Sequence, residues 1–378
     1  MKILFLVGDY PSLENPSASI FIHNQVKTLQ MKDIQVTVLL TDIRSIRKKR
    51  KYGYSKYMYD GVQIYRYAIP CGPIPFLDEI LSKIAAQAGI KKVFREFGRP
   101  DIIHCHFTLA GYSAQAIKRK YGIPYILTEH NSTMIKNKIK YRLGRIAKIS
   151  YNNSDRLIAV GSYLKSKMIQ YTSHNILVLP NIIPPYFKIG SYKKYEKITF
   201  ITVGQLITRK RMDLTISAFI KLRELFPDIE LKVVGTGPLL SELRNICKKL
   251  NAEQAIEFLG FCNNEKLPEL YSKCHCFVLP SEAETFGVVY AEAAACGIPV
   301  IATNCGGPSD IVNQSNGLLI QKDNEQELIR AMKHVIDNIE QYDAQQISKD
   351  VISKFGQKYI SKELIEIYNG VLNLHLLC

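Results

Sequence analysis

Several features that mark common classes of protein are absent from this sequence. It contains no tryptophan, no apolar run long enough to span a bilayer, and no Gly-x-Gly-x-x-Gly motif. Its nine cysteines form no Cys-x-x-Cys pair, and Cys274-His275-Cys276 has no second pair at zinc-finger spacing. These absences argue against a membrane-spanning protein, a dinucleotide-binding dehydrogenase and a structural zinc site. We therefore expect the cysteines to be reduced core residues.

The start of the chain is typical of a cytoplasmic protein. Residues 1–9 contain one lysine, a short apolar run and then an acid, without a small-residue cleavage site. This pattern predicts a buried first strand rather than a signal peptide. The 378 residues are 47% hydrophobic and 22% charged, which is a globular composition and too long for a single core. Two domains are therefore expected, in the cytoplasm.

Positive charge is concentrated in the first half of the chain. Residues 1–188 contain 29 Lys and Arg against 11 Asp and Glu, whereas residues 189–378 contain 21 against 23. Two segments concentrate the excess, residues 44–51 and the run from Lys136 to Lys148. Such clusters either form a solvated face or attract a polyanion such as an anionic lipid surface. A nucleic-acid partner is not expected, because no aromatic-studded basic strand or recognition-helix pattern accompanies the charge.

Short β-branched runs alternate with longer helix-like stretches, which predicts mostly parallel sheets covered by helices. A polar stretch at 191–197 marks a linker. We expect an α/β protein of two Rossmann-like, doubly wound domains, residues 1–188 and 189–355, with a helix at 356–378 joining the first domain. Ligands of such sheets bind beyond the carboxyl ends of the strands, hence in a cleft that the two domains share. The predicted strands are 2–7, 35–40, 62–67, 101–105, 124–128, 156–160, 176–179, 198–203, 230–234, 255–259, 276–279 and 299–302.

Residues 280–299 are the most informative segment. They leave a strand, form a loop, open a helix near Gly287 and close it at Gly297, which a proline follows. The free N–H groups at a helix start favour a phosphate or sugar oxygen, and glycine lets a ligand approach the backbone. Glu284 would lie in the loop and Glu292 in the first turns of the helix. Both carboxylates can accept hydrogen bonds from a vicinal diol, although surface acids and plain helix caps give the same pattern.

The spacing of these two acids, with Phe286-Gly287 after the first and Gly297-Ile298-Pro299 after the second, resembles a known signature. It is similar to that of retaining glycosyltransferases of the GT-B fold, in the group called family 4. The resemblance covers most of the chain. The stretch YPSLENPSASIFIHNQVKTL resembles members that build exopolysaccharide, capsule or teichuronic-type polymers. The other matching segments, in the family's order, are DIIHCHF, ILTEH, DRLIAVGSYL, TVGQLITRKRMDLTISAF, VVGTGPLLSEL, FLGF, VLPSEAETFG and NCGGPSDIV.

The resemblance implies a nucleotide-sugar donor site in the second domain. Glu292 would bind the ribose of the donor. Glu284 would bind the transferred sugar, together with the N–H groups of Phe286, Gly287 and Val288. The donor would be a UDP-sugar or GDP-sugar, used as a substrate, and no cofactor is implied.

The resemblance also implies catalysis without a metal. Arg209 and Lys210 would hold the diphosphate and stabilise the charge that develops on the leaving group. The Asp-x-Asp metal motif of the other major transferase fold is absent. Retention would proceed with the departing phosphate oxygen taking the acceptor proton on the same face, so no enzymic base or nucleophile is required.

Further site residues follow from the same resemblance. His130 would contact the donor sugar or the acceptor, and His106 would support the wall of the cleft, although an isolated histidine is more often structural. Gly235 and Gly237 would form a tight turn near the nucleotide base. Gly204 and Ser19 complete the implied donor contacts.

Three positions depart from the family pattern. Gln205 stands where many members have arginine. Ser17-Ala18-Ser19 occupies the loop in which a glycine usually approaches the donor, and a side chain there could narrow the site. Ile182 replaces the common glycine after Asn181.

The acceptor is inferred from charge. The basic first domain favours a lipid-diphosphate-linked glycan on an anionic membrane, reached by peripheral attachment to the inner face of the cell membrane. The protein would then add a hexose-type sugar during synthesis of a surface polysaccharide. Two alternatives remain open: a non-catalytic subunit that docks a polymer-assembly complex on the membrane, and a nucleotide-sugar epimerase.

Overall fold

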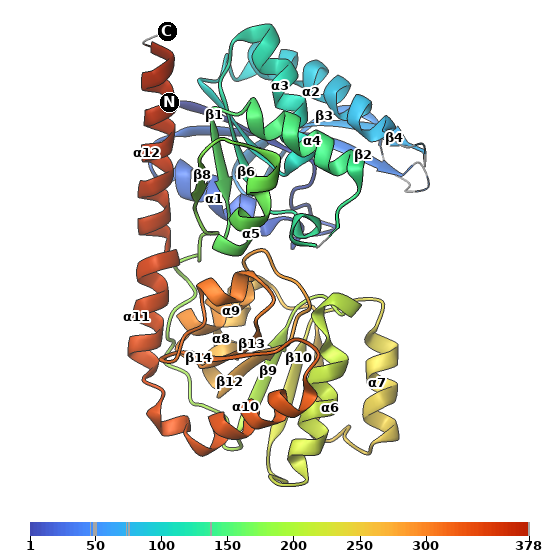
Figure 1. Ribbon diagram of the computed structural model, residues 1–378, viewed down its shortest axis with the longest axis vertical. Coiled ribbons are helices and arrows are strands. Elements are labelled where there is room, and N and C mark those ends of the chain that lie inside the picture. The colour runs from blue at the N-terminus through green and yellow to red at the C-terminus, as the bar shows by residue number, and fades with distance from the viewer. Residues whose placement is uncertain (46, 48–50, 73, 75, 137, 377–378) are drawn as a thin grey trace. The chain divides into compact units, whose positions relative to one another are not determined.

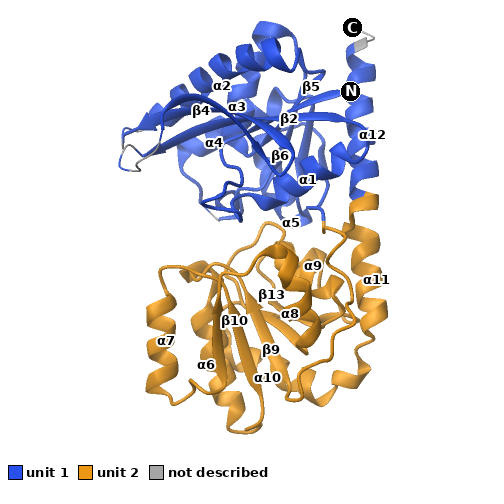
Figure 2. Cartoon of the chain, turned by 180° about the vertical axis from the view of Figure 1, so that it is seen from behind, with its two compact units in different colours: residues 1–182, 360–378 blue, residues 183–359 orange. Residues whose placement is uncertain are grey.

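A computed structural model describes residues 1–45, 47, 51–72, 74, 76–136 and 138–376. The chain forms two compact units, which Figure 2 shows in different colours. Unit 1 comprises Met1–Ile182 and Ile360–Cys378, and unit 2 comprises Ile183–Tyr359. The chain thus passes from unit 1 to unit 2 after residue 182, where we expected residue 188, and returns after residue 359, where we expected residue 355.

Unit 1 contains an eight-stranded sheet in the order β3-β4-β2-β1-β5-β6-β7-β8. All neighbouring strands are parallel except β3 and β4. Strand β3 was not predicted from the sequence, because this edge strand buries little apolar surface and shows no clear hydrophobic run. The strands are β1 (Lys2–Val7), β2 (Gln35–Ser45), β3 (Gly53–Tyr59), β4 (Val62–Cys71), β5 (Ile102–His106), β6 (Tyr125–Glu129), β7 (Arg156–Ala159) and β8 (Ile176–Val178).

Helices cover both faces of this sheet (Figure 1). On one face α2 packs on β2 and β4 and against α3, and α3 packs against α4. On the other face α1 and α12 share a core with the inward side chains of β1, which include Ile3, Phe5 and Val7. The helices are α1 (Ile20–Gln30), α2 (Leu77–Glu96), α3 (Thr108–Tyr121), α4 (Tyr141–Asn152), α5 (Ser162–Met168) and α12 (Gln357–Leu376).

Unit 2 contains a six-stranded, wholly parallel sheet in the order β11-β10-β9-β12-β13-β14. This is the strand order of a doubly wound nucleotide-binding fold. The chain adds strands toward one edge of the sheet from β9 to β11, and toward the other edge from β12 to β14, so the strand order reverses between β9 and β12. Of these strands only β14 was not predicted. The strands are β9 (Thr199–Val203), β10 (Glu230–Val234), β11 (Ile256–Gly260), β12 (Cys276–Leu279), β13 (Val300–Thr303) and β14 (Gly317–Ile320). The prediction of two doubly wound α/β units is confirmed.

In unit 2, helices alternate with strands along the chain. They are α6 (Met212–Arg223), α7 (Leu240–Lys249), α8 (Leu267–Lys273), α9 (Val288–Ala295), α10 (Glu325–Asp337) and α11 (Ala344–Phe355). Gly356 separates α11 from α12, and α12 corresponds to the helix that we expected at 356–378. Ile360, Leu364 and Tyr368 lie one turn apart on α12 and pack into the core of unit 1. Within the described residues, no helix has the length and apolar character needed to span a membrane.

Candidate active site

Two loops meet at the centre of the unit 2 sheet, where β9 and β12 are neighbours. Ligands of open parallel sheets bind at such a point, beyond the carboxyl ends of the strands. The loop after β9 forms a short 3-10 helix that carries Arg209 and Lys210, and the loop after β12 carries Glu284. A hydrogen bond of 2.9 Å from the Glu282 N–H to the Arg209 carbonyl joins the two loops. The fold therefore brings the predicted acid and the predicted cations together.

Glu284 forms ion pairs with both cations. Its Oε1 accepts a hydrogen bond from Lys210 Nζ at 2.5 Å, and its Oε2 lies 3.4 Å from Arg209 Nη1. Arg209 Nη1 also donates to the carbonyl oxygen of Ala283 at 2.6 Å. Burial raises the pKa of Glu284, but Lys210 and Arg209 outweigh burial and hold that pKa below its usual value. The cluster thus contains one carboxylate and two cations, and its surplus positive charge favours an anion.

Glu292, on α9, is in the opposite protonation state. Its side chain is buried, with 4% of the residue exposed. Burial raises the pKa of Glu292 to about 8, and Lys210 offsets this only in part. Glu292 is therefore mostly protonated at neutral pH while Glu284 is ionised. Two nearby carboxyl groups whose environments push their pKa values apart are typical of a functional site.

The start of α9 requires its glycine. Gly287 adopts a φ of 89°, in the left-handed region, and an added Cβ would lie 2.5 Å from Tyr290 Cδ2. Phe286 is buried and meets Phe355 edge-on, with ring centroids 5.3 Å apart. Val288 is the first residue of α9, so the N–H groups of this turn lie at the positive end of the helix dipole. The predicted helix N-terminus is therefore present beside the ion-pair cluster.

Gly204, Gly235 and Gly237 lie where the loops after β9 and β10 touch. A Cβ at Gly235 would lie 1.9 Å from the Gly204 carbonyl oxygen, and one at Gly237 would lie 2.4 Å from the Leu206 carbonyl oxygen. The close approach of two backbones therefore accounts for the glycines at 235 and 237 without a ligand. Their predicted contact with the donor stays a prediction.

In unit 1, His106 and His130 come together at the carboxyl ends of β5 and β6. His106 Nδ1 lies 2.8 Å from His130 Nε2, and the two rings stack with centroids 5.1 Å apart. Both residues are buried, His106 at 1% and His130 at 8% exposure, and the supporting role of His106 stays a prediction. Burial lowers the pKa of His130 to about 3 and the pKa of His106 well below its usual value. Both rings are therefore neutral at pH 7, and His130 can exchange hydrogen bonds but carries no charge.

Three further residues of this cluster were not predicted as site residues from the sequence. His104 stacks on His106 with ring centroids 4.4 Å apart, and its Nδ1 lies 2.7 Å from the Tyr368 hydroxyl on α12. Glu129 is fully buried and accepts hydrogen bonds from the Tyr151 hydroxyl at 2.8 Å and from the His130 N–H at 2.9 Å. Glu129 stands directly before His130 in the sequence, which was the available signal. Nothing local pointed to Tyr368.

Ser19 precedes α1 in the left-handed conformation, with a φ of 47°. Its hydroxyl lies 3.4 Å from Asp9 Oδ2, and Asp9 also pairs with Arg44 at 2.8 Å. A glycine adopts this backbone geometry at lower cost than serine. The departure at Ser17-Ala18-Ser19 thus falls on a position whose backbone suits glycine. Part of the basic run at 44–51, residues 46 and 48–50, lies outside the described residues.

The chain has two doubly wound units, and in unit 2 an acid and two cations lie where the strand order of the sheet reverses. This architecture is that of the GT-B class of glycosyltransferases. Comparison with known families agrees. The model named Glycosyltransferase Family 4 matches residues 18–186, and the model named Glycosyl transferases group 1 matches residues 187–349. The chain belongs to glycosyltransferase family 4.

Known proteins of similar sequence or structure support this assignment. An uncharacterized glycosyltransferase of Methanocaldococcus jannaschii is 30% identical over 346 residues, 90% of each chain. The phosphatidylinositol N-acetylglucosaminyltransferase GPI3 subunit of Saccharomyces cerevisiae is 22% identical, over 72% of this chain and 63% of its own. Sucrose-phosphate synthase from Thermosynechococcus elongatus has a TM-score of 0.80 at 17% identity, over 99% of this chain and 100% of its own. Anabaena HepE, solved with UDP and glucose, has a TM-score of 0.76 at 19% identity, over 98% of this chain and 100% of its own.

Proposed function

We propose that this glycosyltransferase moves a hexose-type sugar, with retention, from a nucleotide-sugar donor bound by unit 2 to a lipid-linked glycan acceptor bound by unit 1. The product would be part of a surface polysaccharide. The observation that carries the proposal is the cluster of Glu284, Lys210 and Arg209 beside the start of α9. A cluster with a positive surplus at a helix N-terminus is the environment that a sugar diphosphate needs.

Each member of the cluster has a distinct part in the proposed reaction. Lys210 and Arg209 bind the diphosphate and stabilise the negative charge that grows on it as the glycosidic bond breaks. Glu284, which these cations keep ionised, accepts hydrogen bonds from the hydroxyl groups of the transferred sugar. Glu292 binds the ribose diol. In this scheme the two side-chain cations neutralise the leaving group, so the reaction is proposed to need no metal.

The neutral histidines limit the roles available in unit 1. Because the pKa of His130 is about 3, its ring neither donates nor accepts a proton readily at pH 7. We propose that His130 orients the sugar or the acceptor through hydrogen bonds. The acceptor hydroxyl then attacks the anomeric carbon on the face from which the diphosphate departs, and its proton passes to the departing phosphate oxygen.

Similar proteins support the choice of substrates. HepE is described in complex with UDP and glucose, which favours a UDP-hexose as the first donor to test. The name of the yeast relative specifies phosphatidylinositol, a lipid, and unit 1 of this chain contains most of its positive charge. A lipid-linked acceptor at an anionic membrane surface on the cytoplasmic side accounts for that charge.

Calorimetric titration tests the donor site. Purified protein is titrated in EDTA with UDP, GDP and their sugar conjugates, for the wild type, Glu292→Ala and Glu282→Ala. Glu282 is exposed in the same loop and serves as the matched control. We expect one nucleotide to bind without metal and Glu292→Ala to lose about 0.5–1.5 kcal/mol, as for a hydrogen bond to a neutral group, because Glu292 is mostly protonated at neutral pH. If no nucleotide binds, the proposed function fails and the membrane-docking subunit becomes the better hypothesis.

A further inference from the structure

Helix α2 has a row of apolar side chains on its outer surface. Phe76, Ile80 and Ile84 are 54%, 48% and 50% exposed. They are spaced four residues apart, so they follow one line along the helix and its N-terminal end. We call these three residues the α2 ridge. The inner side of α2 already has its own apolar contacts, because Ala85 and Ile90 are fully buried, so the ridge is additional to the core.

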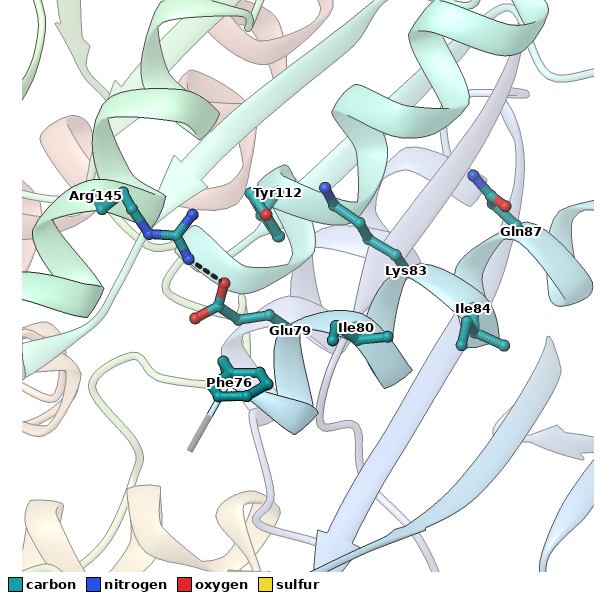
Figure 3. Close-up of a pocket in the computed structure, with 8 residues that line it drawn as sticks. All are labelled: Phe76, Glu79, Ile80, Lys83, Ile84, Gln87, Tyr112 and Arg145. Carbon is teal, nitrogen blue, oxygen red and sulfur yellow. Dashed lines mark hydrogen bonds and ion pairs between the residues drawn. The ribbon is translucent and has the colours of Figure 1, made fainter. Parts of the chain in front are cut away.

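The α2 ridge borders a cavity of about 480 Å³ within unit 1. Figure 3 shows the ridge residues along one side, with Tyr112 of α3 and Arg145 of α4 on the other. An exposed apolar row beside a hollow is more than the scattered apolar residues that any soluble protein exposes. Such a combination is typical of a surface that binds a ligand, another protein or a membrane.

Two cations, Lys83 and Arg145, line the cavity beside the ridge. Lys83 lies over the Tyr112 ring, with Nζ 3.6 Å from its centroid. On α4, Tyr141, Arg145 and Lys148 share one exposed face, since they are spaced by four and three residues, and Tyr141 is 88% exposed. We call Lys83, Arg145 and Lys148 the basic rim.

Nearby acids offset only part of this charge. Glu79, whose side chain is 4% exposed, is paired with Arg145 at 2.6 Å and with Arg142. Asp78 is paired with Arg142 as well. These pairs hold α2 and α4 together, and the outer surface keeps the basic character of the whole N-terminal half of the chain.

We propose that the α2 ridge and the basic rim are the surface through which unit 1 binds an anionic lipid bilayer. The ridge and Tyr141 enter the interfacial region, and the rim contacts lipid phosphates. This inference rests on the proposed function, because it supplies the contact by which the enzyme reaches a lipid-linked acceptor. A second copy of the chain is disfavoured as the occupant, since a symmetric contact would bring like charges together around the ridge.

Vesicle binding tests the surface. The wild type is compared with Ile80→Ser/Ile84→Ser and with Lys83→Gln/Lys148→Gln, on phosphatidylcholine vesicles with and without phosphatidylglycerol. We expect binding only to the anionic vesicles, and salt should weaken it. The ridge variant should lose about tenfold in affinity, since two half-exposed isoleucines no longer enter the interface. The rim variant should lose about fivefold for each lysine removed, which corresponds to about 1 kcal/mol per charge.

Matched variants in unit 2 control for general effects. Leu225 and Leu250 are 64% and 51% exposed, so Leu225→Ser/Leu250→Ser removes similar apolar surface far from α2 in the sequence. Lys248→Gln/Lys249→Gln removes two exposed charges. Both controls should bind vesicles as the wild type does. The proposal is overturned if vesicle charge has no effect, or if the ridge variant and its control bind equally.

The absence of tryptophan allows a direct readout. Ile84→Trp introduces the only indole of the chain, and Leu225→Trp introduces one in unit 2. We expect a blue shift and quenching by brominated lipid for Ile84→Trp alone. Sedimentation of the wild type and the ridge variant tests whether a second copy of the chain covers the ridge. If the wild type is a dimer and the ridge variant is a monomer, a second copy covers the ridge and the proposal fails. Nucleotide titration of the same variants distinguishes failure of the proposed donor site from failure of the proposed membrane surface, because vesicle binding can persist when donor binding fails.

Discussion

The two units distribute their charge in opposite ways. Unit 1 contains nearly all of the net positive charge of the chain, yet its candidate site consists of the neutral, buried histidines His104, His106 and His130. Unit 2 has almost balanced charge, yet its candidate site is an ion-pair cluster around Glu284. Desolvation suppresses charge unless an oppositely charged partner is close, as Lys210 and Arg209 are to Glu284. For the three histidines desolvation is the dominant influence, and it keeps them neutral. The net charge of a domain therefore reports on its surface and not on its site.

The largest effect is expected from removing the partner of the buried carboxylate. Lys210→Ala should destabilise unit 2 by about 3 kcal/mol, because it leaves Glu284 buried with only the more distant Arg209. It should also abolish most of the transfer activity. Hydrogen exchange of the unit 2 core measures the stability without assuming that both units unfold together.

A double variant distinguishes this explanation from a general loss of packing. Lys210→Ala/Glu284→Ala should recover part of the lost stability, since no charge is then left unpaired. If the double variant is less stable than Lys210→Ala, the charge argument for unit 2 is wrong.

The next effect concerns pH, for which the two units should differ in sign. The pKa of Glu292 is raised to about 8, so the folded state holds a proton that the unfolded state loses above about pH 4.5. Unit 2 should therefore lose stability as pH rises to 8, by up to about 1.4 kcal/mol per pH unit. Glu292→Gln should remove this slope in hydrogen exchange measured between pH 5 and 8.

In unit 1 the same measurement should show the reverse. The pKa values of His104 and His130 are lowered to about 3, so below pH 6.5 the unfolded chain takes up protons that the folded unit excludes. Unit 1 should lose stability as pH falls from 6.5 to 5. His174→Phe changes an exposed histidine and should leave that slope intact. If the free energy of unfolding changed with pH in the same direction in both units, the two sites would not differ in the way that their pKa shifts predict.

A smaller effect is expected from the residue that contacts His130. His106→Phe keeps a ring for stacking but removes the nitrogen that lies 2.8 Å from His130 Nε2. We expect about a tenfold loss in kcat/KM, or about 1.4 kcal/mol, which is the scale of one neutral hydrogen bond. Nitrogen NMR of the His130 ring should show a change from one tautomer to a mixture. An altered kcat/KM with an unchanged His130 spectrum would point to a purely structural role.

The smallest effect is expected at the loop before α1. Ser19→Gly should stabilise unit 1 by about 0.5 kcal/mol, because relief of the left-handed backbone slightly exceeds the added freedom of glycine in the unfolded chain. Ser19→Ala keeps the strain and loses the hydroxyl, so it should be the least stable of the three in thermal unfolding. If Ser19→Gly is instead the least stable, the contact with Asp9 is worth more than the backbone strain.

Residue patterns predicted most of the sheet and the centre of the donor site. Buried parallel strands are short, continuous β-branched runs, and each one predicted is present. The edge strand β3 was not predicted, because its residues are mostly half-exposed and form no continuous apolar run. Helix α9 and its glycine were predicted because caps and stop signals are local. The helix expected at 356–378 corresponds to α12, and Gly356 before it is a local helix-stop signal.

Local sequence thus determined the elements, the acid and cation motif, and the surplus of basic residues in the first half, since each depends on neighbours in the chain. Tertiary structure decided the chemical state of those residues. Lys210 and Glu284 are 74 positions apart, and His104 and Tyr368 are 264 apart, so only folding could pair them. Burial then separated two glutamates eight positions apart into one ionised and one protonated group, because desolvation depends on the atoms around a side chain and not on its neighbours in sequence.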